Sequence, residues 1–245
     1  MGKPISFSLI VPVYSEHHNL VSNIANMDLK LREITNSGTI SDYEIIVLWG
    51  IGGIKSRSLL NDLRRLKIRN VVIYENQYPE LGIMFKRGIS LARNEYVGLI
   101  TPFNQVNLYS LKNILEYLNT HDMVVAFIGN RSARLWYRAV ASEINTKLVN
   151  WLFGLNLKYY HLNFYRTALV RKVPFATNSH AVMVEAGVWM AKSGINFAQV
   201  PFEMIPHNFK SKSRAFRVTN IIKVFKAYAA LFWQIRILGK RIDLN

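Results

Sequence analysis

The sequence predicts an α/β fold, with a mostly parallel, doubly wound sheet flanked by helices and followed by a C-terminal amphipathic helix. Apolar segments of strand length alternate with segments whose apolar residues recur at helical spacing. No linker, internal repeat or low-complexity stretch interrupts the 245 residues. Right-handed crossovers between parallel strands then place the strand tips along one edge of the sheet.

The elements follow from runs of β-branched and aromatic residues for strands and from three-to-four-residue apolar spacing for helices. In the first half, the predicted strands are 7–13, 43–49, 70–74, 96–100 and 123–127, and the predicted helices are 17–35, 56–66, 81–93 and 108–118. After Gly129 we expect a long helix over 139–153. Short strands at 162–165 and 197–200 then flank a helix that contains Glu185. We expect one domain over 1–205 and an extension over 206–245.

The extension opens with a basic loop, 207–217, and continues as a helix over 218–238. Its apolar residues recur at helical spacing and define one face: Ile221, Val224, Phe225, Tyr228, Phe232, Ile235 and Leu238. Lysines and an arginine lie roughly opposite this face. Such a basic amphipathic helix suits an anionic bilayer surface, but packing on the protein's own core explains the pattern as well.

Composition narrows the functional classes. The formal net charge is +16, which indicates an anionic partner such as a lipid surface, a phosphate-bearing substrate or nucleic acid. Cysteine is absent, which excludes disulfides and thiolate metal sites. Neither a signal peptide nor an apolar run long enough to span a bilayer is evident. We therefore expect a cytoplasmic protein, peripheral on the inner face of the membrane. Nucleic acid is disfavoured because no binding motif accompanies the charge.

The segment 95–105 is the expected ligand site, since ligands of open α/β sheets bind beyond the carboxyl ends of strands. Its apolar strand ends abruptly at Thr101-Pro102, and no carboxylate follows before position 116. A divalent cation needs hard oxygen ligands, usually including carboxylates. This strand tip therefore lacks the groups that would hold one.

Several segments, in order along nearly the whole chain, resemble family 2 glycosyltransferases, and specifically the dolichol-phosphate-mannose synthase branch. Pro12-Val13-Tyr14-Ser15-Glu16 resembles the Pro-x-Tyr-Asn-Glu opening of that family. The other similar segments are Tyr43 to Val47, Gly82 to Gly88, Ala92 with Glu95 to Val97, Ile128 to Arg131, Tyr165-Arg166, Glu185, Val200-Pro201 and Ser213-Arg214. The resemblance implies a GT-A, nucleotide-diphospho-sugar transferase-like fold. It also implies transfer of a hexose from a nucleotide sugar, often onto a polyprenyl phosphate at a membrane.

The chain departs from the family at its acidic motifs. Trp49-Gly50 stands where the family has Asp-Asp, and Thr101-Pro102-Phe103 stands where it has Asp-x-Asp. The family's Asp-x-Thr-x-x-Phe-Arg element is replaced by the segment 157–163. From these departures we predict that no divalent metal and no other cofactor takes part, and that cationic side chains neutralise the leaving phosphate instead.

The resemblance also implies site residues. The predicted donor-binding residues are Pro12, Tyr14, Glu16, Trp49, Thr101, Asn104 and Gln105, and the predicted phosphate-binding residues are Arg131, Arg134, Arg138, Lys210, Lys212 and Arg214. Glu185 is the predicted general base near the acceptor.

Each of these assignments has a structural alternative. Glu16 is also a favourable helix N-terminal carboxylate, and Trp49 either stacks on a ligand or fills an empty pocket. The cations also suit a solvated or lipid-facing surface. Glu185 also suits a helix-face residue paired with a lysine or arginine.

The leading functional hypothesis is a divergent, metal-independent glycosyltransferase that acts at the membrane surface on a lipid-phosphate or glycan acceptor. The alternative is a catalytically inactive relative that keeps the fold as a partner or regulator of another membrane or glycan-assembly protein, since fold does not determine function. A nucleotide sugar, an anionic membrane surface or polyprenyl phosphate, and a protein partner are the corresponding binding partners.

Overall fold

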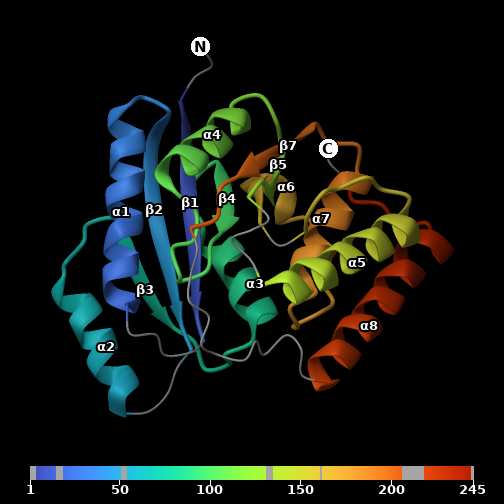
Figure 1. Ribbon diagram of the computed structural model, residues 1–245, viewed down its shortest axis with the longest axis horizontal. Coiled ribbons are helices and arrows are strands. Elements are labelled where there is room, and N and C mark those ends of the chain that lie inside the picture. Colours follow the sequence, from blue (N-terminus) through green and yellow to red (C-terminus); the bar gives the residue numbers. More distant parts are fainter. Residues whose placement is uncertain are drawn as a thin grey trace.

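A computed structural model describes residues 4–14, 19–50, 54–130, 135–160, 162–205 and 218–243 (Figure 1). A seven-stranded sheet with strand order β3-β2-β1-β4-β6-β5-β7 forms its centre. The strands are β1 Ile5–Val13, β2 Ile40–Trp49, β3 Val71–Glu75, β4 Tyr96–Leu99, β5 Met123–Ile128, β6 Asn163–Arg166 and β7 Phe197–Phe202. Only β6 runs antiparallel to its neighbours β4 and β5. The predicted fold class, an α/β protein with a mostly parallel sheet, is confirmed.

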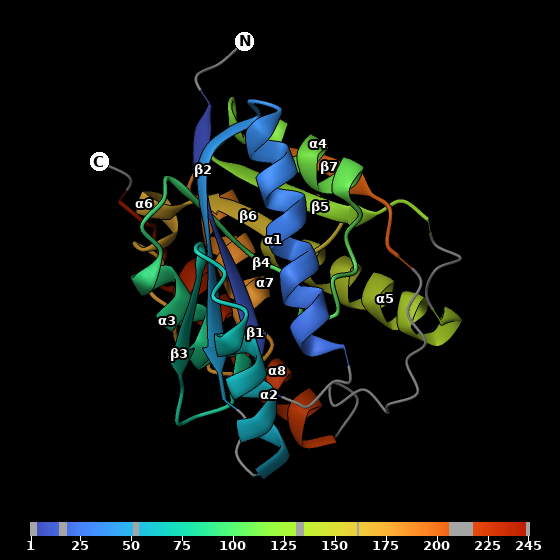
Figure 2. The same ribbon diagram turned by 90° about the vertical axis from the view of Figure 1, so that its left-hand side faces the viewer.

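Helices cover both faces of the sheet (Figures 1 and 2). One face is covered by α1 Leu20–Asn36, α2 Ile54–Arg65 and α4 Leu108–Leu118. The other is covered by α3 Leu81–Leu91, α5 Trp136–Phe153, α6 Thr167–Val170, α7 Val182–Lys192 and α8 Val218–Phe232, which continues as the π-helical turn η3 Trp233–Ile237. The central strands are continuous apolar runs because both of their faces are buried.

The winding of the chain reverses between β1 and β4. Parallel pairing joins β1 to β2 on one side and to β4 on the other. The crossover helices α1 and α2 lie on one face of the sheet, whereas α3, which leads into β4, lies on the opposite face. The carboxyl ends of β1 and β4 therefore border the crevice in which doubly wound proteins bind ligands.

The predicted strand over 162–165 exists as β6, but the expectation that all strand tips share one edge is wrong for it. β6 inserts between β4 and β5 in the opposite direction, with Phe164 opposite both Gly98 and Val124. Gly98 allows this pairing, because a Cβ atom there would lie 2.3 Å from the Phe164 ring.

The C-terminal helix packs on the core with part of its predicted apolar face. Tyr228 and Ile235 are buried against the sheet-covering helices, together with Leu231, whereas Ile221 and Phe225 are exposed. Only part of the predicted apolar face therefore packs on the core. Within the described ranges, none of the helices has the length and apolar character that a bilayer-spanning helix requires.

Candidate functional site

Three neighbouring strands end at the same edge of the sheet and bring Tyr14, Gly50 and Thr101 to it. The Gly50 backbone N–H donates to the Val13 carbonyl at 2.8 Å, which holds the tips of β1 and β2 together. The Ile100 N–H donates to the carbonyl of Ile10 at 3.0 Å and ties the end of β4 to β1. The predicted convergence of strand tips is therefore present for these strands.

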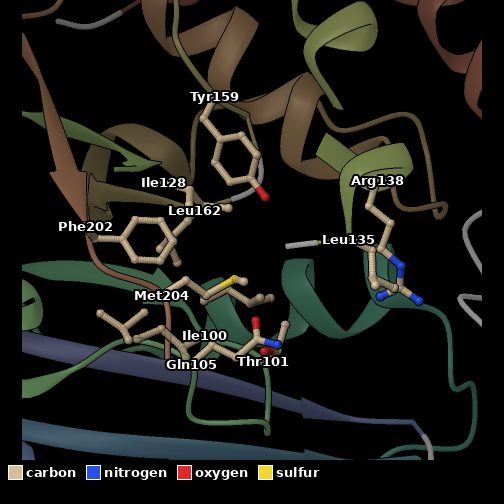
Figure 3. Close-up of a pocket in the computed structure, with 12 residues that line it drawn as sticks. Ile100, Thr101, Gln105, Ile128, Leu135, Arg138, Tyr159, Leu162, Phe202 and Met204 are labelled. Atoms are coloured by element: carbon tan, nitrogen blue, oxygen red, sulfur yellow. The ribbon is translucent and has the colours of Figure 1, made fainter. Parts of the chain in front are cut away.

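A cavity of about 150 Å³ opens beside the tip of β4, and we call it the strand-tip pocket (Figure 3). Its walls come from segments that are distant in the sequence: the end of β4, the ends of β5 and β7, the start of α5 and the turn before β6. The lining residues are Leu99, Ile100, Thr101, Gln105, Val106, Ile128, Leu135, Arg138, Tyr159, Leu162, Phe202 and Met204.

The pocket combines apolar walls with a small number of polar groups. Leu162, Phe202 and Met204 form one wall in Figure 3, and the hydroxyl of Tyr159 points into the space beside them. Arg138, on the first turns of α5, is the charged residue of the lining and lies across the pocket from this wall in Figure 3. Ligand pockets typically combine apolar lining with a small number of polar groups that orient the ligand, and a guanidinium is well suited to a phosphate.

The loop after β4 is fastened to α1. Lys30 donates from its ammonium group to the Asn104 side-chain carbonyl at 2.8 Å and to the Val106 carbonyl at 2.6 Å. Asn23 donates to the Pro102 carbonyl at 2.9 Å. Asn104 adopts a left-handed backbone conformation, with φ of 52°, which asparagine tolerates better than most residues. Burial lowers the pKa of Lys30. These contacts position Thr101 and Gln105, the loop residues that line the pocket.

The opposite wall of the pocket is also held by side-chain amides. Asn130 donates to the Met204 carbonyl at 2.9 Å and accepts from the Met204 N–H at 2.8 Å. The Ile205 N–H donates to the Gln105 carbonyl at 2.8 Å, which joins the two walls. The pocket is therefore supported by hydrogen bonds on both sides, as a preformed binding site requires.

Two predicted donor-binding residues are core residues. Trp49, at the tip of β2, is only 3% exposed, and its indole N–H donates to the Ser56 hydroxyl at 3.1 Å. Pro12 is buried in β1 opposite Leu48. Neither lines the strand-tip pocket. For Trp49, burial favours the interpretation that its indole fills space over stacking on a ligand.

Tyr14 and Glu185 border a second groove, between α3, α7 and α8. Tyr14 lies there beside Glu80, Asn178 and Lys223, and the continuation of the groove reaches Glu185. This groove shares no lining residue with the strand-tip pocket. The structure thus separates the predicted base from Thr101, Gln105 and Arg138.

Glu185 is 4% exposed, and its carboxylate accepts hydrogen bonds from the backbone. It accepts from the Ala176 N–H at 2.8 Å and from the Thr177 N–H at 3.2 Å. Burial raises the pKa of Glu185. This geometry fixes the turn before α7. Lys86 adds an electrostatic interaction with the carboxylate, as the structural alternative expected of a nearby lysine, but the hydrogen bonds come from the backbone.

Six predicted site residues lie outside the described residues: Glu16, Arg131, Arg134, Lys210, Lys212 and Arg214. Conversely, the sequence did not identify Tyr159, Phe202, Met204 or Lys30. The first three resemble ordinary core residues in the sequence. Lys30 offered one signal, since it is the only lysine of its helix and lies between the buried positions Asp28 and Leu31. Its contacts, however, depend on a loop 74 residues away.

Comparison with solved structures supports the fold described above. No family model matches the chain, and no curated protein matches it in sequence. Solved structures of glucosyl-3-phosphoglycerate synthase from Mycobacterium tuberculosis do match. The complex with Mn²⁺, UDP and phosphoglyceric acid has a TM-score of 0.63 at 14% identity, over 94% of this chain and 78% of that chain. The complex with Mg²⁺ and UDP gives 0.61 at 12% identity, over 94% and 79%. The fold is therefore that of the GT-A nucleotide-sugar transferases.

These comparisons contradict the prediction that no divalent metal takes part. Several of the similar structures were solved with Mn²⁺ or Mg²⁺ and UDP. Another was solved with Mn²⁺ and UDP-glucose, at a TM-score of 0.62 and 14% identity over 94% of this chain and 79% of that chain. The prediction relied on the residues of one strand tip. Because similar structures contain Mn²⁺ or Mg²⁺, those residues alone are not enough to exclude a metal.

The described residues of this chain do not themselves fit a divalent ion. The loop after β4 offers only neutral oxygens, from Thr101, Asn104 and Gln105. Among the described residues, no cluster of three or more histidines or carboxylates is placed to hold a metal.

Proposed function

We propose that this protein is a glycosyltransferase that moves a sugar from a nucleotide sugar to an acceptor bearing a phosphate and an apolar group, at a membrane surface. The strand-tip pocket supports this proposal. It lies at the carboxyl end of β4 in a GT-A fold, its walls are mostly apolar, and Arg138 is the charged residue of its lining. An apolar wall beside a guanidinium suits a lipid phosphate better than a free sugar, whose hydroxyls need many polar partners.

The chemistry of the pocket favours a phosphate as the nucleophile. In the proposed step, an acceptor oxygen forms a bond to the anomeric carbon, and the bond from that carbon to the diphosphate breaks. The nucleoside diphosphate leaves with the electron pair. A phosphate acceptor is already anionic, so it needs no general base, whereas an alcohol would have to lose a proton. Glu185, the carboxylate predicted as base, lies outside this pocket, which is consistent with a phosphate acceptor.

The ligands of the similar structures also support an acceptor that carries a negative charge. Glucosyl-3-phosphoglycerate synthase was solved with UDP-glucose and phosphoglyceric acid together. For the present chain we propose a nucleotide sugar as donor, and an acceptor whose phosphate contacts Arg138 while its apolar part enters the strand-tip pocket.

Binding and turnover test this proposal separately. Thermal shift with UDP, UDP-glucose and other nucleotides, each with Mn²⁺, Mg²⁺ or EDTA, measures donor binding and its dependence on metal. Release of nucleoside diphosphate is then measured with a short-chain polyprenyl phosphate or with 3-phosphoglycerate. We expect release with the polyprenyl phosphate. Release with 3-phosphoglycerate alone would overturn the apolar acceptor, and no response to any nucleotide would overturn glycosyl transfer.

Two variants locate the acceptor. Met204→Trp fills the strand-tip pocket and Arg138→Met removes its guanidinium, and we expect each to raise the KM for polyprenyl phosphate at least tenfold. Arg64→Met is the matched control, because Arg64 is an exposed arginine of α2 that pairs with Glu75 of the edge strand β3 and does not line the pocket. Equal KM values in all three variants would place the acceptor elsewhere.

The second candidate function is a non-catalytic partner protein with the same fold. Burial of Trp49 supports this function, because its indole fills space at the tip of β2 that a bound nucleotide would otherwise use. The indole is held there by its hydrogen bond to Ser56. Trp49→Gly would open this space. A nucleotide response that appears only in the variant would favour the non-catalytic function, whereas a response in the wild type would refute it.

A further inference from the structure

Two neighbouring helices carry most of the large apolar side chains that the described residues expose. Of the eighteen such side chains, twelve lie within residues 135–151 and 221–238, on α5, α8 and their ends. They include Trp136, Trp151 and Trp233, which are 78%, 77% and 58% exposed, whereas Trp49 and Trp189 are buried. Water-exposed indoles concentrated in this way mark a surface that meets another phase or molecule.

The exposed side chains of α5 form a stripe on its outer face. The inward side of this helix is defined by Val149 and Phe153, which are buried. Trp136, Val140 and Ile144 follow at four-residue intervals, and Trp151 follows seven residues later on the same face. This stripe is therefore directed away from the core.

α8 has the same organisation. Its inward side is used for packing through Tyr228 and Leu231, which are buried. Ile222, Phe225 and Trp233 are exposed on its other side. The helix therefore has a core-packing stripe and a separate exposed apolar stripe, so packing on the core does not explain the second.

Specific contacts hold α5 and α8 side by side (Figure 1). The Tyr228 hydroxyl donates to the Asn145 side-chain carbonyl at 2.8 Å, and the Arg236 Nε–H donates to the Leu152 carbonyl at 3.2 Å. The rings of Phe153 and Phe232 lie 6.3 Å apart between centroids. The two outer stripes are therefore presented by one supported pair of helices.

Charge distinguishes among the surfaces that could cover these stripes. Residues 136–153 and 218–243 contain seven lysines and arginines and two acidic residues. α8 itself contains Lys223 and Lys226 and no acidic residue. A two-fold interface with a second copy would bring these like charges together. An anionic lipid surface complements them, tryptophan favours the level of the headgroups, and lysine stems reach past apolar side chains to the phosphates.

We infer that the outer faces of α5 and α8 form a docking surface for an anionic lipid bilayer. This docking surface deepens the proposed function at one point. The start of α5 exposes Trp136 on the docking surface, while Leu135 and Arg138 line the strand-tip pocket. Docking would therefore bring the pocket to the level of lipid headgroups, where a lipid phosphate is held.

Vesicle flotation of the full chain without substrates tests the docking surface. One set of vesicles contains phosphatidylcholine alone, and the other contains phosphatidylglycerol as about a third of the lipid, at about 0.15 M salt. We expect flotation only with the anionic vesicles, and a blue shift of tryptophan fluorescence. The double variant Trp151→Glu, Trp233→Glu should bind these vesicles at least tenfold more weakly. Tyr109→Glu, an 81% exposed position on α4, is the matched control and should bind normally.

Other outcomes overturn the docking surface. Absence of flotation with anionic vesicles, or equal binding by the double variant, would do so. A dimer in light scattering that the double variant converts to a monomer would identify a second copy as the occupant. Thermal melts of all variants confirm folding. Flotation is measured without nucleotide, so a protein that docks but does not respond to nucleotides would refute the proposed function and leave the docking surface standing.

Discussion

Replacing Lys30 by methionine removes two of the hydrogen bonds that fasten the loop after β4 to α1 and keeps most of the aliphatic stem. The lost bonds run from the ammonium group to the Asn104 side chain at 2.8 Å and to the Val106 carbonyl at 2.6 Å. Hydrogen bonds to charged groups contribute about 1.5–3 kcal/mol each. Burial, which lowers the pKa of Lys30, offsets part of this gain because it disfavours the ammonium form.

We therefore expect Lys30→Met to lower the free energy of unfolding by about 1–3 kcal/mol. For a chain of this size, that corresponds to a fall in melting temperature of roughly 2–12 °C. Lys192→Met, at a partly exposed position in the last turn of α7, is the control. Calorimetry of the two variants measures the difference. Equal melting temperatures would refute the conclusion that Lys30 holds the loop.

The pH dependence of stability provides a second measurement on the same variant. Since the pKa of Lys30 is lower in the folded protein, the unfolded chain retains this proton to higher pH. Stability therefore rises with pH between the lowered value and the ordinary value of 10.5. Lys30→Met lacks this contribution, so the melting temperatures of the wild type and the variant should diverge further as pH rises through that window.

Two further substitutions test the supporting structure. Glu185→Gln places an amide NH₂ group against the N–H of Ala176 or Thr177, and should cost about 1–3 kcal/mol. Because the folded-state pKa of Glu185 is raised, the wild type loses stability relative to this variant as pH rises above about 4.5, which melts between pH 4 and 7 would show. Gly98→Ala forces a Cβ against Phe164 at 2.3 Å and should lower stability by about 1–3 kcal/mol. Unchanged chemical denaturation of this variant would show that β4 and β6 adjust freely.

The spacing of apolar residues predicted strands and helices well where short-range interactions determine them. The strand predicted over 43–49 is the buried end of β2, and the helix predicted over 108–118 has the bounds of α4, where Asn107 caps the first turn by accepting from the Ser110 N–H. The direction of β6 was not predictable, because four residues contain no information about which neighbours they join. The place of β6 between β4 and β5 depends on partners that lie 38 to 70 residues away in the sequence.

The candidate site was predictable only in part. Thr101, Gln105 and Arg138 were predicted and do share the strand-tip pocket. Tyr159 and Met204 were missed because an apolar or aromatic residue that lines a cavity has the same sequence pattern as one that fills the core. The prediction of no metal failed because it treated the absence of one motif as a property of the whole protein.

The sequence by itself determined the fold class, through the periodicity of its apolar residues, and the strongly cationic character of the chain. It also determined that the tip of β4 has no carboxylate. Only the tertiary structure decided which apolar residues of α5 and α8 pack inward and which remain in water. The reason is that helical periodicity identifies an apolar face, whereas burial depends on where the neighbouring helix and the sheet lie. For the same reason, only the fold could show that Lys30, distant in the sequence from the strand-tip pocket, supports its wall.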